Sequence, residues 1–200
     1  MACRACHEKH GILQCSTCEW THYCGARCAD ADWQRHFIED HACEERLAPA
    51  TRVLEPERPG HGALYVGGIN AMLKLDALGI DAVVSVLHRM HPDEEAVLRT
   101  LIAPEKRPWK RYFFYDDPAE PISDAFEESA AWIAQQLAAG RNVLVHCWAG
   151  VSRSVTLVLY YMITRRGFAD ADAALRAVRA LRPQANPNDG FMNQLKNRHQ

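Results

Sequence analysis

The stretch Val143-Leu-Val-His-Cys-Trp-Ala-Gly-Val-Ser-Arg-Ser-Val155 decides how the rest of the chain is interpreted. Its apolar start, residues 143–145, predicts a short buried strand, and the apolar residues after Ser154 predict a helix. A tight loop between a strand and the start of a helix binds anions well, because its backbone N–H groups point inward and the helix dipole is positive there. The stretch therefore predicts a binding site for an anion such as phosphate.

Two side chains of this loop add chemistry to anion binding. Cys147 lies at the predicted mouth of the site, where the positive field of the helix favours the thiolate, the nucleophilic form of the side chain. Arg153 carries a planar fork of N–H donors that matches two phosphate oxygens, which a lysine cannot do. A Cys and an Arg at this spacing often arise by chance. Here His146, the glycine, both serines, the strand and the helix all stand where the chemistry needs them.

The pattern His-Cys-x-Ala-Gly-x-Ser-Arg-Ser of residues 146–154 resembles the catalytic loop of the dual-specificity protein phosphatases, which belong to the cysteine-dependent protein tyrosine phosphatase superfamily. Residues 64–68, 78–80 and 187–195 resemble further landmarks of that family. The resemblance covers residues 60–198. It implies an enzyme that hydrolyses phosphotyrosine, phosphoserine and phosphothreonine through a cysteinyl-phosphate intermediate.

In the reaction that this resemblance implies, each site residue has a role. Cys147 attacks the phosphorus while Arg153 and the loop N–H groups bind the equatorial oxygens. Ser154 is expected to hydrogen-bond the departing thiolate in the second step. This chemistry needs no metal or other catalytic cofactor. The predicted phosphate-binding residues are Trp148, Ala149, Gly150, Val151, Ser152 and Arg153.

The general acid is expected in the acidic stretch Asp116-Asp-Pro-Ala-Glu-Pro-Ile122, just after a predicted strand. Either aspartate could be only a cap or turn residue. The family's acid precedes a Leu or Ile by six residues, so the resemblance assigns the role to Asp116 and leaves Asp117 a secondary contributor at most. The acid would protonate the leaving oxygen, and its carboxylate would then activate water.

Two other functions fit parts of the pattern. Loops that bind polyanions such as inositol lipids tend to contain lysine between the Cys and the Arg, whereas residues 148–152 are neutral. This favours a phosphoprotein substrate and leaves a phosphoglycan or an RNA 5′-phosphate as one alternative. A phosphate-binding adaptor with little turnover is the second alternative, and the intact Cys147 and Arg153 with a nearby aspartate argue against it.

The region after residue 60 predicts an α/β fold with a central, mainly parallel sheet flanked by helices. The catalytic loop is then expected at the C-terminal ends of the strands, where parallel sheets bind their ligands. Strands are predicted at residues 63–68 and 111–115, and apolar runs predict buried strands at residues 82–87 and 143–145. Helices are predicted after a cap at Asn70, from Pro92, from Ser123 to the stop at Gly140, after Arg153, over 169–181 and after Asn188.

The composition argues against a nucleic-acid-binding, membrane or secreted protein. The 200 residues carry a net charge of only -2, which gives no electrostatic basis for binding nucleic acid or anionic membranes. No apolar run approaches the ~18 residues of a membrane span, and the start of the chain lacks the apolar region of a signal peptide. We therefore expect a cytoplasmic protein, with the nucleus as a second location.

Seven of the eight cysteines lie between residues 3 and 43. Paired Cys-x2-Cys turns with further ligands downstream, in a segment too short to bury much apolar surface, predict two structural zinc ions. The segment resembles a MYND zinc finger, from Tyr23-Cys24 through Asp32-Trp33 onward, and this resemblance implies a protein or proline-containing peptide as its partner. It also implies that Cys3, Cys6, Cys24 and Cys28 hold one zinc and that Cys15, Cys18, His36 and Cys43 hold the other.

His36 and Cys43 stand further apart than the last two ligands of that family. Seven residues of unbroken helix would separate them by about 10 Å, too far for two ligands of one zinc. Either the helix ends soon after His36, or His41 replaces it as the ligand. The predicted organisation is a finger at residues 1–48, a proline-containing linker at 49–60 and the catalytic domain at 61–200.

Overall fold

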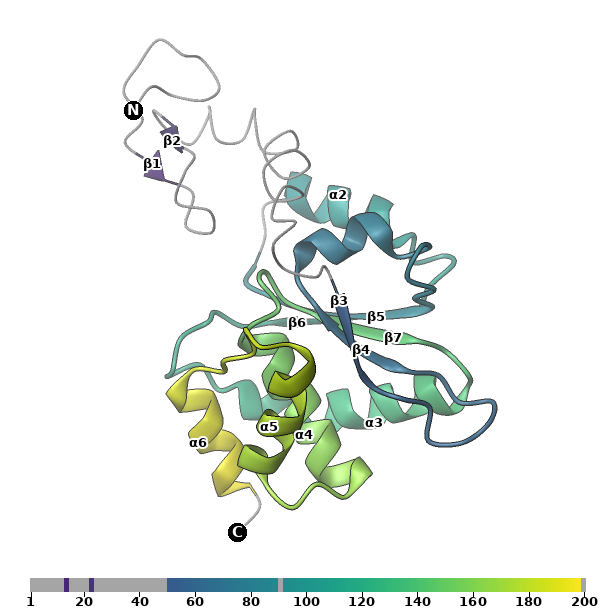
Figure 1. Ribbon diagram of the computed structural model, residues 1–200. Coiled ribbons are helices and arrows are strands. Elements are labelled where there is room, and N and C mark those ends of the chain that lie inside the picture. Colours follow the sequence, from purple (N-terminus) through teal and green to yellow (C-terminus); the bar gives the residue numbers. More distant parts are fainter. Residues whose placement is uncertain (1–12, 15–21, 24–49, 90–91, 199–200) are drawn as a thin grey trace. The chain divides into compact units, whose positions relative to one another are not determined.

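The protein is seen in a computed structural model that describes residues 13–14, 22–23, 50–89 and 92–198 (Figure 1). The chain divides into two units, residues 48–90 with 99–200 and residues 1–47 with 91–98. In the smaller unit β1 (Leu13–Gln14) pairs antiparallel with β2 (His22–Tyr23). The zinc finger stays a prediction, because its expected ligands lie outside the described residues: Cys3, Cys6, Cys15, Cys18, Cys24, Cys28, His36 and Cys43, with His41 as the alternative.

A five-stranded sheet organises the larger unit. Its strands lie in the order β3-β4-β7-β5-β6, and every neighbouring pair is parallel except β3 and β4. This confirms the prediction of an α/β fold with a mainly parallel sheet. The central strands β7 and β5 are buried at every position, as expected for strands covered on both faces. The strands are β3 (Ala50–Leu54), β4 (Leu64–Gly67), β5 (Ala82–Leu87), β6 (Trp109–Phe113) and β7 (Val143–His146).

The strand register brings the functional loops together at one edge of the sheet. His146, the last residue of β7, is paired with Gly67 on one side and with Ser85 on the other. Because these strands are parallel, their C-terminal ends meet at the same edge. The loops that follow β4, β5 and β7 therefore start side by side.

Four helices lie together on one face of the sheet (Figure 1): α3 (Phe126–Ala138), α4 (Arg153–Arg166), α5 (Ala171–Leu181) and α6 (Asp189–Asn197). α4 is the central one, because it contacts the other three and is buried from residue 153 to residue 163. It ends at Gly167, whose φ of 72° is the left-handed conformation that a glycine cap supplies. The remaining long helix is α2 (Pro92–Ile102). None of the helices in the described part of the chain is long and apolar enough to cross a bilayer.

The structure departs from the predicted elements in four places, of which β6 is described last. β3 lies inside the segment predicted as a linker. Only Val53 of this edge strand is buried, so its sequence shows no apolar alternation. Its extended conformation comes from backbone pairing with β4. The helix expected after Asn70 is instead the 3₁₀ helix η1 (Ile69–Lys74), which starts after Gly68 because the N–H of Ile69 donates to Trp148 O. The helix predicted from Ser123 begins as the 3₁₀ helix η2 (Ile122–Ala125) and continues as α3.

Strand β6 also starts two residues earlier than predicted. Trp109 and Lys110 pair with Val83 and Val84, so the sheet extends back to the residue after Pro108. Residues 114 and 115 then lie beyond the strand, on the loop that leads to Asp116.

Candidate active site

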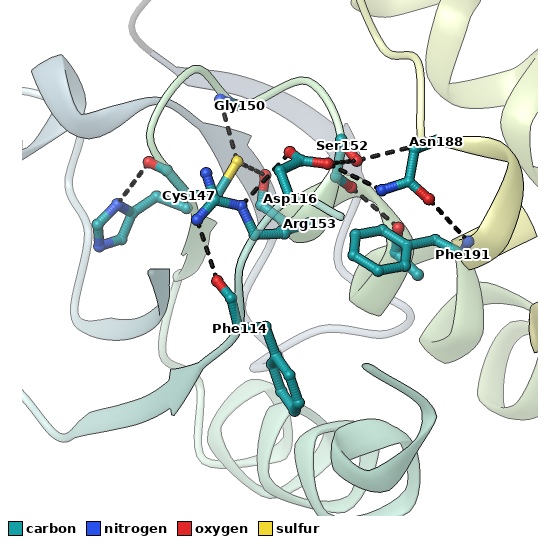
Figure 2. A network of polar contacts seen from close by, with 11 residues as sticks. Phe114, Asp116, Cys147, Gly150, Ser152, Arg153, Asn188 and Phe191 are labelled. Carbon is teal, nitrogen blue, oxygen red and sulfur yellow. Dashed lines mark hydrogen bonds and ion pairs between the residues drawn. The ribbon is translucent and has the colours of Figure 1, made fainter. Parts of the chain in front are cut away.

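The predicted anion-binding loop, residues 147–152, connects the end of β7 to the start of α4 (Figure 2). It turns at Gly150, which has a φ of 69°. A Cβ atom at this position would lie 2.5 Å from the carbonyl carbon of Gly67 and 2.5 Å from Nη2 of Arg182. Both the conformation and the close approach therefore require a glycine here.

The carbonyl groups of this loop are bound from outside it. Trp148 O accepts a hydrogen bond from the N–H of Ile69 at 2.8 Å, and Val151 O accepts one from the N–H of Asn186 at 2.8 Å. Gly150 O accepts from Nε of Arg182 at 2.8 Å. In a trans peptide the C=O and the following N–H point in opposite directions. Carbonyls held outward thus direct the N–H groups inward, which is the arrangement of an anion-binding nest.

Cys147 lies inside this ring of N–H groups, with only 1% of its surface exposed. Its Sγ accepts a hydrogen bond from the N–H of Gly150 at 3.3 Å and from Oγ of Ser154 at 3.2 Å. Both contacts, together with the N-terminal end of α4, favour negative charge on the sulfur. The structure therefore brings the predicted nucleophile and Ser154 together.

Arg153, the first residue of α4, lies across the mouth of the loop. Its Nη1 donates to Phe114 O at 3.2 Å, and its Nε lies 3.4 Å from Oδ2 of Asp116. The residue is 7% exposed, so its orientation is determined by these neighbours rather than by solvent. The predicted phosphate-binding arginine and the predicted acid are thus adjacent.

The two aspartates of the acidic stretch have different surroundings. Asp116 Oδ1 accepts from Oγ of Ser152 at 2.7 Å and from Nδ2 of Asn188 at 3.0 Å, so the carboxylate is held against the loop (Figure 2). Asp117 Oδ1 accepts instead from the N–H of Ala119 at 2.8 Å, which is the contact of a turn residue. Of these two aspartates, Asp116 is the one for which the described structure shows a contact with a side chain of the loop, that of Ser152.

His146 is completely buried behind the loop. Its Nδ1 lies 3.1 Å from Cys147 O, and its Nε2 lies 2.6 Å from Oγ of Ser85. Because a carbonyl can only accept, Nδ1 carries the proton and Nε2 accepts from the serine. Burial lowers the pKa of His146 to about 4, and the charge of Arg153 also lowers it, against a rise from the bond to Cys147 O. The ring is therefore neutral at neutral pH and orients the loop.

Two residues of the site were not identified from the sequence. Asn188 caps α6, since its Oδ1 accepts from the N–H of Phe191, and its own N–H donates to Oγ of Ser152 at 3.2 Å. The sequence signals for Asn188 are its place before a predicted helix and within the family landmark at residues 187–195, and neither indicates a contact with Asp116. Arg182 binds the loop from behind, and the sequence gives no signal that this arginine is buried.

Within residues 50–89 and 92–198 no cluster of three or more His, Cys, Asp or Glu side chains is arranged to hold a metal ion.

Comparison with known proteins gives consistent matches. The family model "Dual specificity phosphatase, catalytic domain" matches residues 64–200. Dual specificity protein phosphatase 15 of Homo sapiens is 35% identical over 133 residues, which cover 66% of this chain and 42% of that protein. The chain thus spans less than half the length of that relative.

Two crystal structures of human proteins resemble the fold. That of human DUSP28 has a TM-score of 0.60 and 28% identity, covering 75% of this chain and 92% of that one. That of the human tyrosine phosphatase-like serine/threonine/tyrosine-interacting protein has a TM-score of 0.63 and 27% identity, covering 74% and 94%.

Proposed function

Because the chain belongs to the dual specificity phosphatase family, we propose that it hydrolyses phosphotyrosine, phosphoserine and phosphothreonine in proteins. The observation that supports this most is the position of Cys147 Sγ. It lies within a loop whose carbonyls are held outward, it accepts two hydrogen bonds, and Arg153 and Asp116 lie at the mouth of the same loop. A nucleophile, an anion-binding nest and an acid are the parts that phosphomonoester hydrolysis needs.

In the first step Cys147 Sγ forms a bond to phosphorus while the bond between phosphorus and the leaving oxygen breaks. The inward N–H groups and Arg153 stabilise the charge on the equatorial oxygens. Asp116 gives its proton to the leaving oxygen, so that the product departs as a neutral alcohol or phenol. The enzyme then carries a cysteinyl phosphate.

In the second step the Asp116 carboxylate takes a proton from water, and the water oxygen bonds to phosphorus. The bond between sulfur and phosphorus breaks, and inorganic phosphate is released. Ser154 Oγ, 3.2 Å from Sγ, stabilises the thiolate as it departs. The roles of Ser152 and Asn188 are to hold the Asp116 carboxylate in place.

An aromatic group beside the site supports a protein substrate. The His88 ring is stacked on the Tyr115 ring, with 5.9 Å between centroids and 16° between planes, and it lies 6.3 Å from the Trp148 ring. Tyr115 is 59% exposed, so its outer face is open to a substrate ring. Burial lowers the pKa of His88, and the charge of Arg153 lowers it further, so both favour the neutral form of the ring. The neutral residues 148–152 likewise suit a single phosphate better than a polyanion such as an inositol lipid.

For residues 1–48 we propose a MYND-type finger with two structural zinc ions, in a reducing compartment such as the cytoplasm or nucleus. Its expected partner is a protein or a proline-containing peptide. The proposed ligand sets are Cys3, Cys6, Cys24 and Cys28 for one ion, and Cys15, Cys18, His36 and Cys43 for the other.

A panel of phosphopeptides and phosphorylated glycans tests the proposal, with wild type and Cys147→Ser compared on each. We expect the wild type to release phosphate from peptides, and Cys147→Ser to bind the same peptides without turnover. The name of the tyrosine phosphatase-like interacting protein provides a precedent for an adaptor role. If the wild type binds phosphopeptides without releasing phosphate, the adaptor role is favoured. If Cys147→Ser still hydrolyses them, Cys147 is not the nucleophile.

A further inference from the structure

Arg182 is a cation buried behind the catalytic loop. It follows the last residue of α5, a helix that packs against α4 and β3. The residue is only 1% exposed, although an arginine is rarely buried to this degree. Removing a guanidinium from water is costly unless donors and charge are compensated. The compensation therefore indicates what the side chain does.

The guanidinium donates to two consecutive carbonyls of the loop. Its Nε lies 2.8 Å from Gly150 O and its Nη2 lies 3.3 Å from Ala149 O. Nη1 reaches β3 and donates to Oγ1 of Thr51 at 3.1 Å. Arg182 thus joins the end of α5, the edge strand and the tightest part of the loop.

The peptide between Ala149 and Gly150 is bound on both sides. Its C=O accepts from Arg182, and its N–H donates to Sγ of Cys147 at 3.3 Å. The next peptide has its C=O, that of Gly150, bound by Arg182 Nε, which directs the N–H of Val151 to the inside of the loop. The side chain polarises both peptides in the sense that makes their N–H groups better donors to an anion.

The charge of Arg182 favours an anion in the loop, as its hydrogen bonds do. Burial lowers the pKa of Arg182, while the nearby Cys147 sulfur, when charged, opposes that effect. An anion in the loop would therefore favour the charged guanidinium, and the charged guanidinium would favour the anion, since such coupling is reciprocal.

We propose that Arg182 is a positioning residue of this site, which holds the Ala149 and Gly150 carbonyls outward and supplies positive charge behind the loop for a bound phosphate. The proposal rests on the proposed function. It assigns Arg182 no contact with the substrate, so its effect is transmitted through the two peptides.

The test compares the full chain with Arg182→Met, Arg182→Lys and the control Arg176→Met, which alters an exposed arginine of α5, the helix that Arg182 follows. Calorimetry measures binding of inorganic phosphate, steady-state assays give kcat and KM on p-nitrophenyl phosphate, and thermal unfolding measures the folded fraction. We expect Arg182→Met to weaken phosphate binding about 10- to 100-fold, the scale for losing one or two charge-assisted hydrogen bonds. Arg182→Lys should recover part of that loss, and Arg176→Met should match the wild type.

A role in packing alone would lower the thermal midpoint and leave the phosphate affinity of the folded protein unchanged. Wild-type affinity in folded Arg182→Met would overturn the proposal, and if that variant does not fold, wild-type affinity in Arg182→Lys would do the same. A wild type that binds phosphate without turnover would contradict the proposed function only. A wild type that binds no phosphate would overturn both.

Discussion

Replacing Asp116 by asparagine separates acid catalysis from the structure of the site. Asparagine keeps an oxygen that can accept from Ser152 Oγ and Asn188 Nδ2, so both hydrogen bonds of Oδ1 can persist. The change removes the ion pair with Arg153, which is 3.4 Å long with the Asp116 side chain 35% exposed. Partly exposed pairs of this kind contribute about 1 kcal/mol or less to folding. We therefore expect Asp116→Asn to remain folded.

The expected loss is in rate. A general acid contributes about 10²–10⁴-fold, which corresponds to roughly 3–5 kcal/mol of transition-state stabilisation. That loss should appear in kcat on a phosphoserine peptide, whose alkoxide leaving group needs a proton. It should be small on p-nitrophenyl phosphate, whose phenolate leaves without one. The ratio of the two losses is the measured quantity.

Asp117→Asn is the matched control, because Asp117 Oδ1 bonds only a turn N–H in the described structure and its asparagine can accept the same bond. The control should retain the wild-type rate on both substrates. Equal losses on the two substrates in Asp116→Asn would refute the acid assignment. A selective loss in Asp117→Asn would transfer the role to that residue.

Three further predictions concern other parts of the protein. Arg153→Lys should lower kcat/KM by about 10²-fold or more, because a point charge cannot replace the guanidinium fork; near-normal kinetics would contradict this. The full chain should contain two zinc ions by elemental analysis, and chelation should leave p-nitrophenyl phosphate hydrolysis largely intact; loss of that activity would make residues 1–48 part of the catalytic unit. The free energy of unfolding should fall as the pH is lowered from 6.5 to about 4, since the buried His146 resists protonation while the unfolded chain accepts the proton. Urea titrations at each pH should show a smaller decrease in the unfolding free energy for His146→Gln than for the wild type over this range. The same dependence of the unfolding free energy on pH in both proteins would exclude a contribution from His146.

The sequence predicted most of the elements that carry the site because their patterns are local. The run at residues 143–145 is apolar throughout, since β7 is covered on both faces, and Gly150 marks the turn that follows. The predicted strand at residues 82–87 coincides with β5 for the same reason. Asp116 is assigned as the acid that acts with Cys147 from a spacing in the family resemblance, and no local pattern indicates it. The structure places both side chains at the same loop.

The parts that were missed depend on contacts between distant segments. β3 has one buried residue, so backbone pairing with β4, which leaves no periodic signal, makes it a strand. Arg182 reads as a basic residue at the end of a helix, where an exposed side chain is the ordinary expectation. Its burial follows from the packing of α5 against α4 and β3. Asn188 reads as a cap, and only the tertiary structure shows that the capping residue also holds the Asp116 carboxylate.

The sequence Ser152-Arg153-Ser154 shows how one helix start can serve three purposes. Ser152 is the N-cap that precedes α4, and Ser154 lies in the first turn of the helix, so their side chains leave the chain in different directions. Ser152 Oγ contacts Asp116 (Figure 2), and Ser154 Oγ contacts Cys147 Sγ. Arg153, the residue between them in the sequence, has its Nε 3.4 Å from Asp116 Oδ2. The two serines therefore cannot exchange roles. Loss of the Ser152 hydroxyl should impair the acid, and loss of the Ser154 hydroxyl should impair departure of the thiolate, although the residues are chemically identical.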